Sequence, residues 1–291
     1  MEWRGKRGSS NIEDRRSDGS SGGFRGGRRG AGAVSAGGGL GLVAIVVVGW
    51  FLGVDLTPLL NGTDGGSVAS EPMTEEDVAA GEFASVTLAY TEDIWAGVFQ
   101  EQLGETYQPA TMVLYKGVTQ SPCGTASGAT GPFYCPGDRK VYLDTAFFTT
   151  LARDLGAKGD FAMAYVVAHE IGHYVQDSLG ILGKANEVRA RVSEEESNEI
   201  SVRIELQADC LAGIWARGVE EQFGAIEKGD FEEAVNAARQ IGDDTLQRNA
   251  GQVPMPDSFT HGTSAQRSRW FQIGLKTGAV NDCDTFAVNN L

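Results

Sequence analysis

Residues 169–173 read His-Glu-Ile-Gly-His, and their types and spacing are those of a zinc site. Residues four apart lie on one face of an α-helix, so the two imidazoles can bind a single zinc ion. Glu170 lies at the edge of that face, where it can take a proton from a water on the metal. The chain has three histidines, and two of them are here. We therefore predict a metal site rather than a histidine pair that only satisfies its hydrogen bonds inside a buried helix.

The pentapeptide lies within a stretch of helical periodicity, residues 160–179. Asp160 is a candidate N-cap, and Gly180 can end the helix. Apolar residues recur at helical spacing, which predicts a buried core helix. Such a helix supplies only two ligands, whereas a catalytic zinc needs a third protein ligand and one open position.

The third ligand has two candidates, a downstream carboxylate and the remaining histidine, His261. A histidine six residues after the second is excluded, because that position is Leu179. Glu205 and Asp209 are four residues apart, so they share a helix face. One carboxylate can bind the metal while the other accepts the free ring N–H of a ligand histidine. Helical carboxylates are commonly only solvated, but downstream of this motif, in a chain with few other ligands, we favour the metal site.

The helix that carries this pair is well defined in the sequence. Ser193 and Glu196 form a capping box at its start, and Gly218 can end it. A final helix is predicted over residues 265–276, with Thr263 or Ser264 as its cap.

His261 lies in the Pro- and Gly-containing loop before that final helix. From there it can donate a hydrogen bond to the oxyanion of a tetrahedral intermediate, with Arg267 fixing it or adding positive charge. Two alternatives stay open. His261 can be a surface residue without a role, or it can be the zinc ligand, with Glu205 supporting a histidine.

Several blocks together resemble the bacterial putative neutral zinc metallopeptidases. The blocks are residues 3–7 (Trp-Arg-Gly-Lys-Arg), 11–16 (Asn-Ile-Glu-Asp-Arg-Arg), 131–136 (Gly-Pro-Phe-Tyr-Cys-Pro), 169–173, 205–210 (Glu-Leu-Gln-Ala-Asp-Cys) and 260–267 (Thr-His-Gly-Thr-Ser-Ala-Gln-Arg). The resemblance implies a single-pass membrane protein with a zinc peptidase domain. It does not identify a physiological substrate.

The Glu-x-x-Ala-Asp pattern, and a histidine followed six residues later by arginine, also resemble the wider gluzincins, including membrane-bound peptidases of the prenyl-protein type. In those enzymes the glutamate is the third ligand and the histidine supports the transition state. This resemblance implies that Glu205, rather than His261, completes the zinc site.

Residues 30–54 form an uncharged stretch of 25 residues whose second half is strongly apolar. As a helix it would extend about 37 Å, enough to cross a bilayer once, so residues 31–54 are predicted to be a transmembrane helix. A cleaved signal sequence is the alternative. Trp50 and Phe51 argue against it as interfacial anchors, and no Ala-x-Ala cleavage site closely follows.

Charge is distributed unevenly about this stretch. Residues 1–30 carry a net charge of +4 and the rest of the chain carries −19. Positive charge on the near side predicts a cytoplasmic N-terminus and an extracytoplasmic domain, anchored in the cytoplasmic membrane. The Gly/Ser-rich residues 1–30 are expected to be disordered. The acidic remainder argues against nucleic acid as a partner.

Four cysteines fit an exported domain. Cys123 and Cys135 flank a short Gly/Ser/Thr loop and are predicted to pair, while Cys210 and Cys283 form a second expected pair that would hold the last helix over the site. Free buried thiols are the alternative for each pair. Because no Cys-x-x-Cys occurs, a structural zinc knuckle is not expected.

The remaining elements complete the predicted α+β class, which is mostly helical and zincin-like with a small sheet. Residues 55–73 read as a linker, and residues 74–291 as one peptidase domain. Capped helices are predicted to begin at Thr74 and at Thr91. Strands are expected over residues 111–116 and 140–144, the second either as a substrate-binding edge strand, as in gluzincin-like sites, or as an internal strand.

These features predict a membrane-anchored zinc endopeptidase acting on peptides or proteins. His169, His173 and Glu205 would hold Zn²⁺, Glu170 would be the general base, Asp209 would orient a histidine and His261 would stabilise the oxyanion. Two alternatives remain: a non-peptidase zinc hydrolase, and a membrane-tethered scaffold with a structural zinc. The intact Glu170 counts against the scaffold, because a structural site needs no base. The oligomeric state is not predicted.

Overall fold

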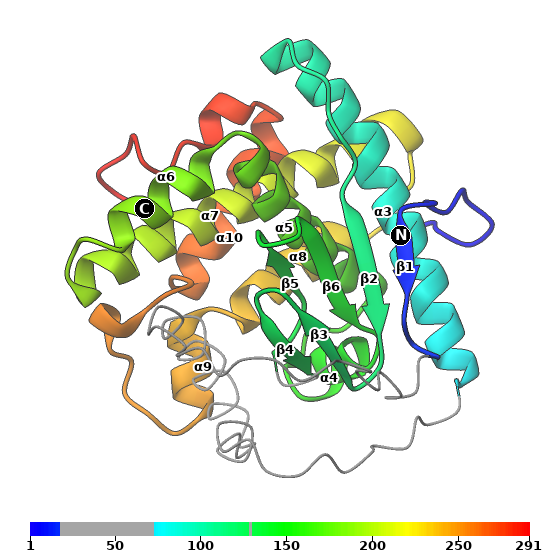
Figure 1. The fold of residues 1–291 in the computed structure, drawn as a ribbon, viewed down its shortest axis with the longest axis horizontal. Coiled ribbons are helices and arrows are strands. Elements are labelled where there is room, and N and C mark those ends of the chain that lie inside the picture. Colours follow the sequence, from blue (N-terminus) through cyan, green and yellow to red (C-terminus); the bar gives the residue numbers. More distant parts are fainter. Residues whose placement is uncertain (18–72, 128–129) are drawn as a thin grey trace, which may run out of the picture.

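The computed structural model describes residues 1–17, 73–127 and 130–291, and Figure 1 shows their fold. This part of the chain is mostly helical and contains two small sheets, in agreement with the α+β class predicted from the sequence. The strands are β1 (Ile12–Asp14), β2 (Thr111–Tyr115), β3 (Val118–Ser121), β4 (Gly124–Ser127), β5 (Phe133–Cys135) and β6 (Lys140–Asp144). The α-helices are α3 (Glu75–Val98), α4 (Phe147–Arg153), α5 (Asp160–Ser178), α6 (Ile181–Arg189), α7 (Glu194–Gly218), α8 (Asp230–Gln240), α9 (Asp243–Asn249) and α10 (Ser264–Thr277). Short helical turns are η1 (Phe99–Leu103), η2 (Val219–Phe223), η3 (Pro256–Ser258) and η4 (Val280–Cys283).

The larger sheet has the strand order β1-β2-β6-β5. β2 and β6 are parallel and have four consecutive buried residues each, as expected of strands covered on both faces. β5 is antiparallel to β6 and forms one edge of the sheet, and β1 forms the other. Of the two alternatives for residues 140–144, the internal strand is the one observed, because β6 is paired on both sides. The three residues of β5 are too short a run for a periodicity argument to identify as a strand.

β1 pairs in parallel with β2, which adds the N-terminal segment to the domain. Trp3 is 7% exposed and packs edge-to-face on Phe83 of α3. Glu13 forms an ion pair with Lys140 of β6. The expectation that residues 1–30 are disordered is therefore wrong for residues 1–17. Arg7 forms ion pairs with Glu92 and Asp93 of α3, whereas Arg15 and Arg16 pair with acidic groups of their own segment.

α5 lies at the centre of the helices and packs against α3, α6, α7 and α8 and against strands β5 and β6. Most of its residues are buried, as the apolar pattern predicted. Asp160 is not the N-cap, which is Gly159. Instead, the Asp160 carboxylate accepts hydrogen bonds from the Met1 ammonium group and from the Trp3 indole N–H.

Three other helices begin at the predicted residues. Thr74, Ser193 and Thr263 each form a complete capping box, at the starts of α3, α7 and α10. The helix predicted to begin at Thr91 is wrong, because Thr91 lies inside α3 and its hydroxyl donates to the Leu88 carbonyl.

α7 ends at Gly218, as expected, but the chain continues directly into another helical turn. η2 continues from α7, and the turn ends at Gly224 in the left-handed conformation. A Cβ at Gly218 would lie 2.8 Å from a methyl carbon of Ile94, so glycine here permits close packing on α3.

In the part of the chain that the structure describes, no helix combines the length and apolarity needed to span a bilayer. The predicted transmembrane segment, residues 31–54, lies outside the described residues. The same holds for residues 18–30 and for residues 55–72 of the predicted linker.

Candidate metal centre

Two helices bring three potential metal ligands together. His169 and His173 come from α5, and Glu205 comes from α7. One ligand atom from each lies within 4.8 Å of the other two. The Glu205 carboxylate lies 3.1 Å from His169 Nε2 and 3.4 Å from His173 Nε2.

This spacing matches the geometry of zinc. Donor atoms about 2.0–2.1 Å from a tetrahedral zinc ion are about 3.3 Å apart. Two neutral imidazoles and one carboxylate are also a donor set that zinc accepts. The three side chains are at most 18% exposed, so they converge in a largely dry environment. The arrangement therefore fits the ion that the motif predicted.

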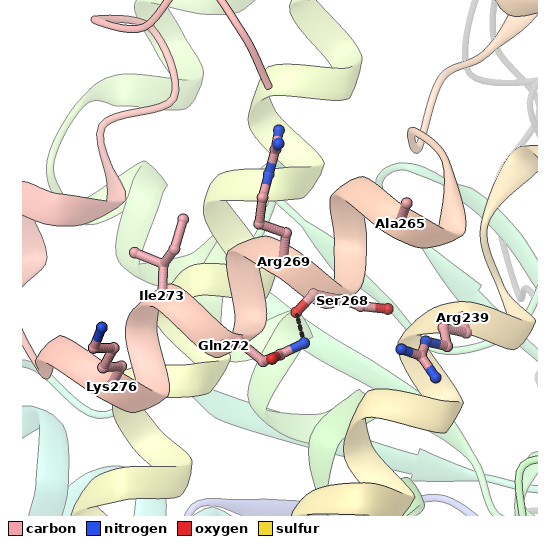
Figure 2. A pocket seen from close by; sticks show the side chains of 7 residues that line it. All are labelled: Arg239, Ala265, Ser268, Arg269, Gln272, Ile273 and Lys276. Carbon is pink, nitrogen blue, oxygen red and sulfur yellow. Dashed lines mark hydrogen bonds between the residues drawn. The ribbon is translucent and has the colours of Figure 1, made fainter.

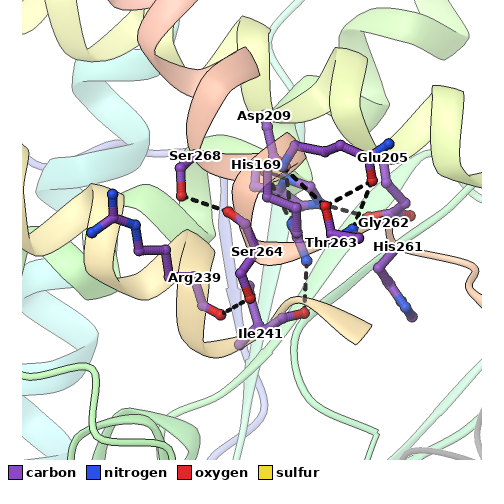
Figure 3. A network of polar contacts seen from close by, with 12 residues as sticks. His169, Glu205, Asp209, Arg239, Ile241, His261, Gly262, Thr263, Ser264 and Ser268 are labelled. Atoms are coloured by element: carbon purple, nitrogen blue, oxygen red, sulfur yellow. Dashed lines mark hydrogen bonds and ion pairs between the residues drawn. The ribbon is translucent and has the colours of Figure 1, made fainter. Parts of the chain in front are cut away.

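Asp209 lies one helical turn beyond Glu205 and is fully buried. Its Oδ1 lies 2.9 Å from His169 Nδ1. Arg267 of α10 donates to both carboxylate oxygens, at 2.9 and 3.0 Å, and the Tyr165 hydroxyl also donates to Oδ1. Figure 3 shows His169, Glu205 and Asp209 side by side in this network. The bidentate contact with Arg267 holds the carboxylate that supports His169.

The electrostatics of the centre favour an ionised Glu205. Burial opposes its charge, but the two histidines hold the pKa of Glu205 well below the ordinary glutamate value. Burial likewise opposes the charge on His169, yet Asp209 and Glu205 raise its pKa to about 10. The His169 ring and the two carboxylates thus stabilise each other's charges.

Glu170 lies beside this cluster and is 8% exposed. Burial raises the pKa of its carboxyl group, although the neighbouring histidines oppose the shift. The backbone of Tyr134, in the edge strand β5, also opposes this rise in the pKa of Glu170. Glu170 therefore lies near β5 and is not among the clustered ligand atoms.

His261 lies at the margin of the centre, as Figure 3 shows. In the described residues, its ring is not among the clustered ligand atoms, which come from His169, His173 and Glu205. The ring Nδ1 lies 3.1 Å from Asp243 Oδ1. Asp243 Oδ2 accepts the backbone N–H groups of residues 260, 261 and 262 at 2.7–2.9 Å. Asp243 therefore fixes both the loop and the ring.

Both expected disulfides are present. Cys123–Cys135 ties the β3–β4 hairpin to the edge strand β5. Cys210–Cys283 ties η4 to α7, directly after Asp209. No cysteine in the chain is left unpaired.

Several polar residues at the centre were not predicted from the sequence. They are Tyr165, Asp243, Gln176 and Gln207. Tyr165 and Gln176 lie four residues before His169 and three after His173, on the same face of α5. Helical spacing was therefore a usable signal for these two, whereas Gln207 and Asp243 reach the centre only through packing between helices.

A surface hollow of about 450 Å³ lies over α8 and α10 (Figure 2). Its lining includes the cations Arg239, Arg269 and Lys276. None of the clustered ligands lines it, so it is separate from the metal centre.

Two imidazoles and a carboxylate around one point, with a buried glutamate beside them, define a zinc hydrolase type of centre. The sequence profile of the family described as "Putative neutral zinc metallopeptidase" matches residues 1–286, and this chain belongs to that family. Family membership implies Zn²⁺ as the metal and a peptidase as the general class.

Similar proteins include the uncharacterized protein YpfJ of Escherichia coli (strain K12). It is 47% identical over 291 residues, which cover 98% of this chain and 99% of YpfJ. The uncharacterized proteins Mb2605 of Mycobacterium bovis and Rv2575 of Mycobacterium tuberculosis are each 42% identical over 195 residues, covering 64% of this chain and 65% of each relative. No solved structure matches the chain.

Proposed function

We propose that this chain is a zinc-dependent endopeptidase in which Glu170 is the general base. The observation that carries the proposal is the clustering of His169, His173 and Glu205 with the Glu170 carboxylate beside them. Bound zinc supplies a Lewis acid that activates a water and polarises a peptide carbonyl. Glu170 takes the proton of the attacking water and passes it to the leaving amine.

Other residues of the chain have supporting roles in this proposal. Asp209 holds the proton of His169 on Nδ1, which leaves Nε2 free for the metal. His261, held by Asp243 at the margin of the centre, donates to the oxyanion. Burial raises the pKa of Glu170, and a raised pKa suits a carboxyl group that must both accept and return a proton.

The edge strand β5 is the proposed site for the substrate backbone. It borders α5 and pairs on one side only, with β6. An extended peptide can add to such an edge through main-chain hydrogen bonds, without a strict sequence requirement. The disulfide Cys123–Cys135 would hold this edge in place.

We further propose that the domain works outside the cytoplasm, because two disulfides persist most readily in an oxidising compartment. Attachment to the cytoplasmic membrane through residues 31–54 belongs to the same proposal. However, β1 and β2 are paired, so residues 1–17 and the domain share one side of any bilayer while they are paired. A single crossing by residues 31–54 would require β1 to leave the sheet.

The test uses the complete chain, because β1 belongs to the fold. Metal analysis and digestion of a peptide library are compared for wild type and Glu170→Gln. Both proteins should bind zinc, and the variant should lose turnover by about 10²–10⁴-fold. Equal peptide hydrolysis by the two proteins would refute the role of Glu170. Hydrolysis of esters but no peptides would favour the non-peptidase hydrolase, and zinc without any hydrolysis would favour the scaffold.

A further inference from the structure

Two buried glutamines connect the metal ligand His173 to the C-terminal segment. His173 Nδ1 lies 2.9 Å from Gln176 Oε1. Gln176 Nε2 donates to the Ile204 carbonyl at 2.8 Å and to Gln207 Oε1 at 2.9 Å. Gln207 Nε2 then donates to the Cys283 carbonyl at 3.1 Å. Gln176 is 0% exposed and Gln207 is 6% exposed, so water does not compete for these contacts.

The direction of this chain of hydrogen bonds is fixed at its far end. A backbone carbonyl only accepts, so the amide group of Gln207 must turn its nitrogen toward Cys283 and its oxygen toward Gln176. For the same reason Gln176 must turn its nitrogen toward Ile204 and Gln207. Reversing either amide would set two oxygen acceptors against each other inside the protein, which is costly.

The consequence for His173 is a single tautomer. Because Gln176 presents only its oxygen, the proton of the neutral imidazole must lie on Nδ1. The lone pair then lies on Nε2, the atom that faces Glu205 at 3.4 Å. We propose that Gln176 and Gln207 are positioning residues that hold His173 in its metal-binding tautomer. The disulfide-tethered C-terminal segment sets the direction of their hydrogen bonds.

The two histidine ligands are then supported in different ways. His169 is supported by a buried charge, Asp209, which Arg267 neutralises. His173 is supported by neutral amides, which add no charge to the centre. The Cys210–Cys283 disulfide is connected to the supports of both histidines. Cys210 follows Asp209 in the sequence, and Cys283 supplies the carbonyl that accepts the hydrogen bond from Gln207.

The first experiment measures zinc affinity by competition with a chelator. Gln176→Met keeps the side-chain length but removes the acceptor, and zinc affinity should fall about ten- to hundredfold. Gln207→Met should lower it by a smaller factor, because Ile204 still orients Gln176. Gln247→Met is the matched control. Gln247 is a buried glutamine whose amide nitrogen and oxygen are both hydrogen-bonded, to Ser258 and Met255. Neither partner takes part in the hydrogen bonds that lead to His173. Gln247→Met should leave zinc affinity unchanged.

Gln176→Glu separates a positioning role from simple packing. A protonated glutamate keeps one acceptor for His173 and one donor for Ile204 or Gln207, so this variant should retain more zinc affinity than Gln176→Met. A residue needed only for packing would give the reverse order, because methionine is tolerated better than a buried acid. The reverse order would therefore overturn the proposal.

The tautomer itself can be observed by NMR in zinc-loaded protein labelled with ¹⁵N-histidine. The chain has only three histidines, so their ring signals can be assigned individually. Two-bond ¹H–¹⁵N spectra should show the His173 proton on Nδ1 in wild type and a broadened or shifted Nδ1 signal in Gln176→Met. An unchanged signal together with unchanged zinc affinity would also overturn the proposal.

The inference rests on His173 being a ligand in the proposed zinc site, but not on the reaction. If wild type binds no zinc, the proposed function itself fails. If wild type binds zinc and hydrolyses peptides while the glutamine variants match it, only this inference fails. Thermal unfolding of each metal-free variant confirms that it folds.

Discussion

At the scale of single residues, the centre depends on which side chains are ligands and which only support them. The Glu205 carboxylate lies within 3.4 Å of both ligand rings. His261 is instead held by Asp243, away from the clustered ligand atoms. The two residues that the sequence left as rival third ligands thus have different surroundings.

Separate alanine substitutions of Glu205 and His261 test which of the two is the third zinc ligand. Glu205→Ala should lose zinc by at least about tenfold in affinity, because it removes a ligand. His261→Ala should keep zinc and lose turnover, by about 10²–10³-fold if it stabilises the oxyanion. Metal content after dialysis and peptide hydrolysis are the measurements. Zinc lost from His261→Ala but retained by Glu205→Ala would reverse the roles.

Asp77 provides a prediction for stability against pH. It completes the capping box of α3 and forms an ion pair with Lys116 at 2.8 Å. Burial opposes its charge, but these hydrogen bonds lower the pKa of Asp77 from 3.8 to about 2. A lowered folded-state pKa stabilises the fold above pH ~3.8, and this contribution disappears as pH falls toward ~2.

Asp77→Asn should therefore reduce the free energy of unfolding by an amount on the order of 2 kcal/mol at pH 6. The difference from wild type should shrink as pH falls from 4 toward 2. Urea unfolding across this range measures it, with substitution of the exposed Asp282 by Asn as the control. A difference that does not depend on pH would contradict the assignment.

At the scale of elements, the centre is assembled by helices that approach closely at glycines. A Cβ at Gly172, next to His173, would lie 3.0 Å from the Ala208 carbonyl oxygen of α7. A Cβ at Gly274 of α10 would lie 1.8 Å from the Cys210 carbonyl oxygen. These contacts set the spacing of α5, α7 and α10, which carry the ligands and Arg267.

Gly274→Ala should therefore force α10 away from α7 and destabilise the protein by about 1–3 kcal/mol or more. Zinc affinity should also fall, because Arg267 of α10 would no longer hold Asp209 in place. Gly183→Ala in α6 is the matched control. Nothing lies within 4 Å of its Cβ position, so helix propensity should raise stability by up to ~1 kcal/mol. Chemical denaturation measures the free energy of unfolding of both variants. Equal changes in the two would exclude close packing of α10 on α7 as the cause.

At the scale of the whole molecule, the N-terminal segment, residues 1–17, packs against the rest of the domain. β1 adds a strand to the sheet, and the Met1 ammonium group forms ion pairs with Asp160, Glu227 and Asp230. Burial opposes the charge of this amino group, but the carboxylates raise its pKa to about 10. The segment thus contacts the start of α5, the helix that carries the metal motif.

Deletion of residues 1–17 should lower the free energy of unfolding by at least ~3 kcal/mol, because it removes a buried tryptophan and a strand ladder. Unfolding in urea compares the deletion with the full chain. Carbodiimide treatment in native membranes, followed by mass spectrometry, should recover a Glu13–Lys140 cross-link, since these groups lie 2.6 Å apart. If no such cross-link forms although purified protein gives one, β1 is not paired in the membrane.

Local sequence rules predicted a large part of this protein. Capping boxes located the starts of α3, α7 and α10, and helical spacing placed His169 and His173 on one face. Both disulfide pairs were also predicted. The capping boxes and the histidine spacing depend on residues that are near in sequence. The disulfides involve only four cysteines, which can pair in about three ways. Helix starts and ligand spacing are therefore readable before any fold is known.

Tertiary structure alone decided the remainder. It made β5 an edge of the sheet, added β1 to that sheet, and brought Asp243 to His261 and the two glutamines to His173. A charged N-terminal segment resembles a disordered one until its partners, more than 75 residues away, are in place. The role of a buried polar residue depends on which group it contacts, and tertiary packing determines that contact. That packing depends on contacts between distant segments, which periodicity does not encode.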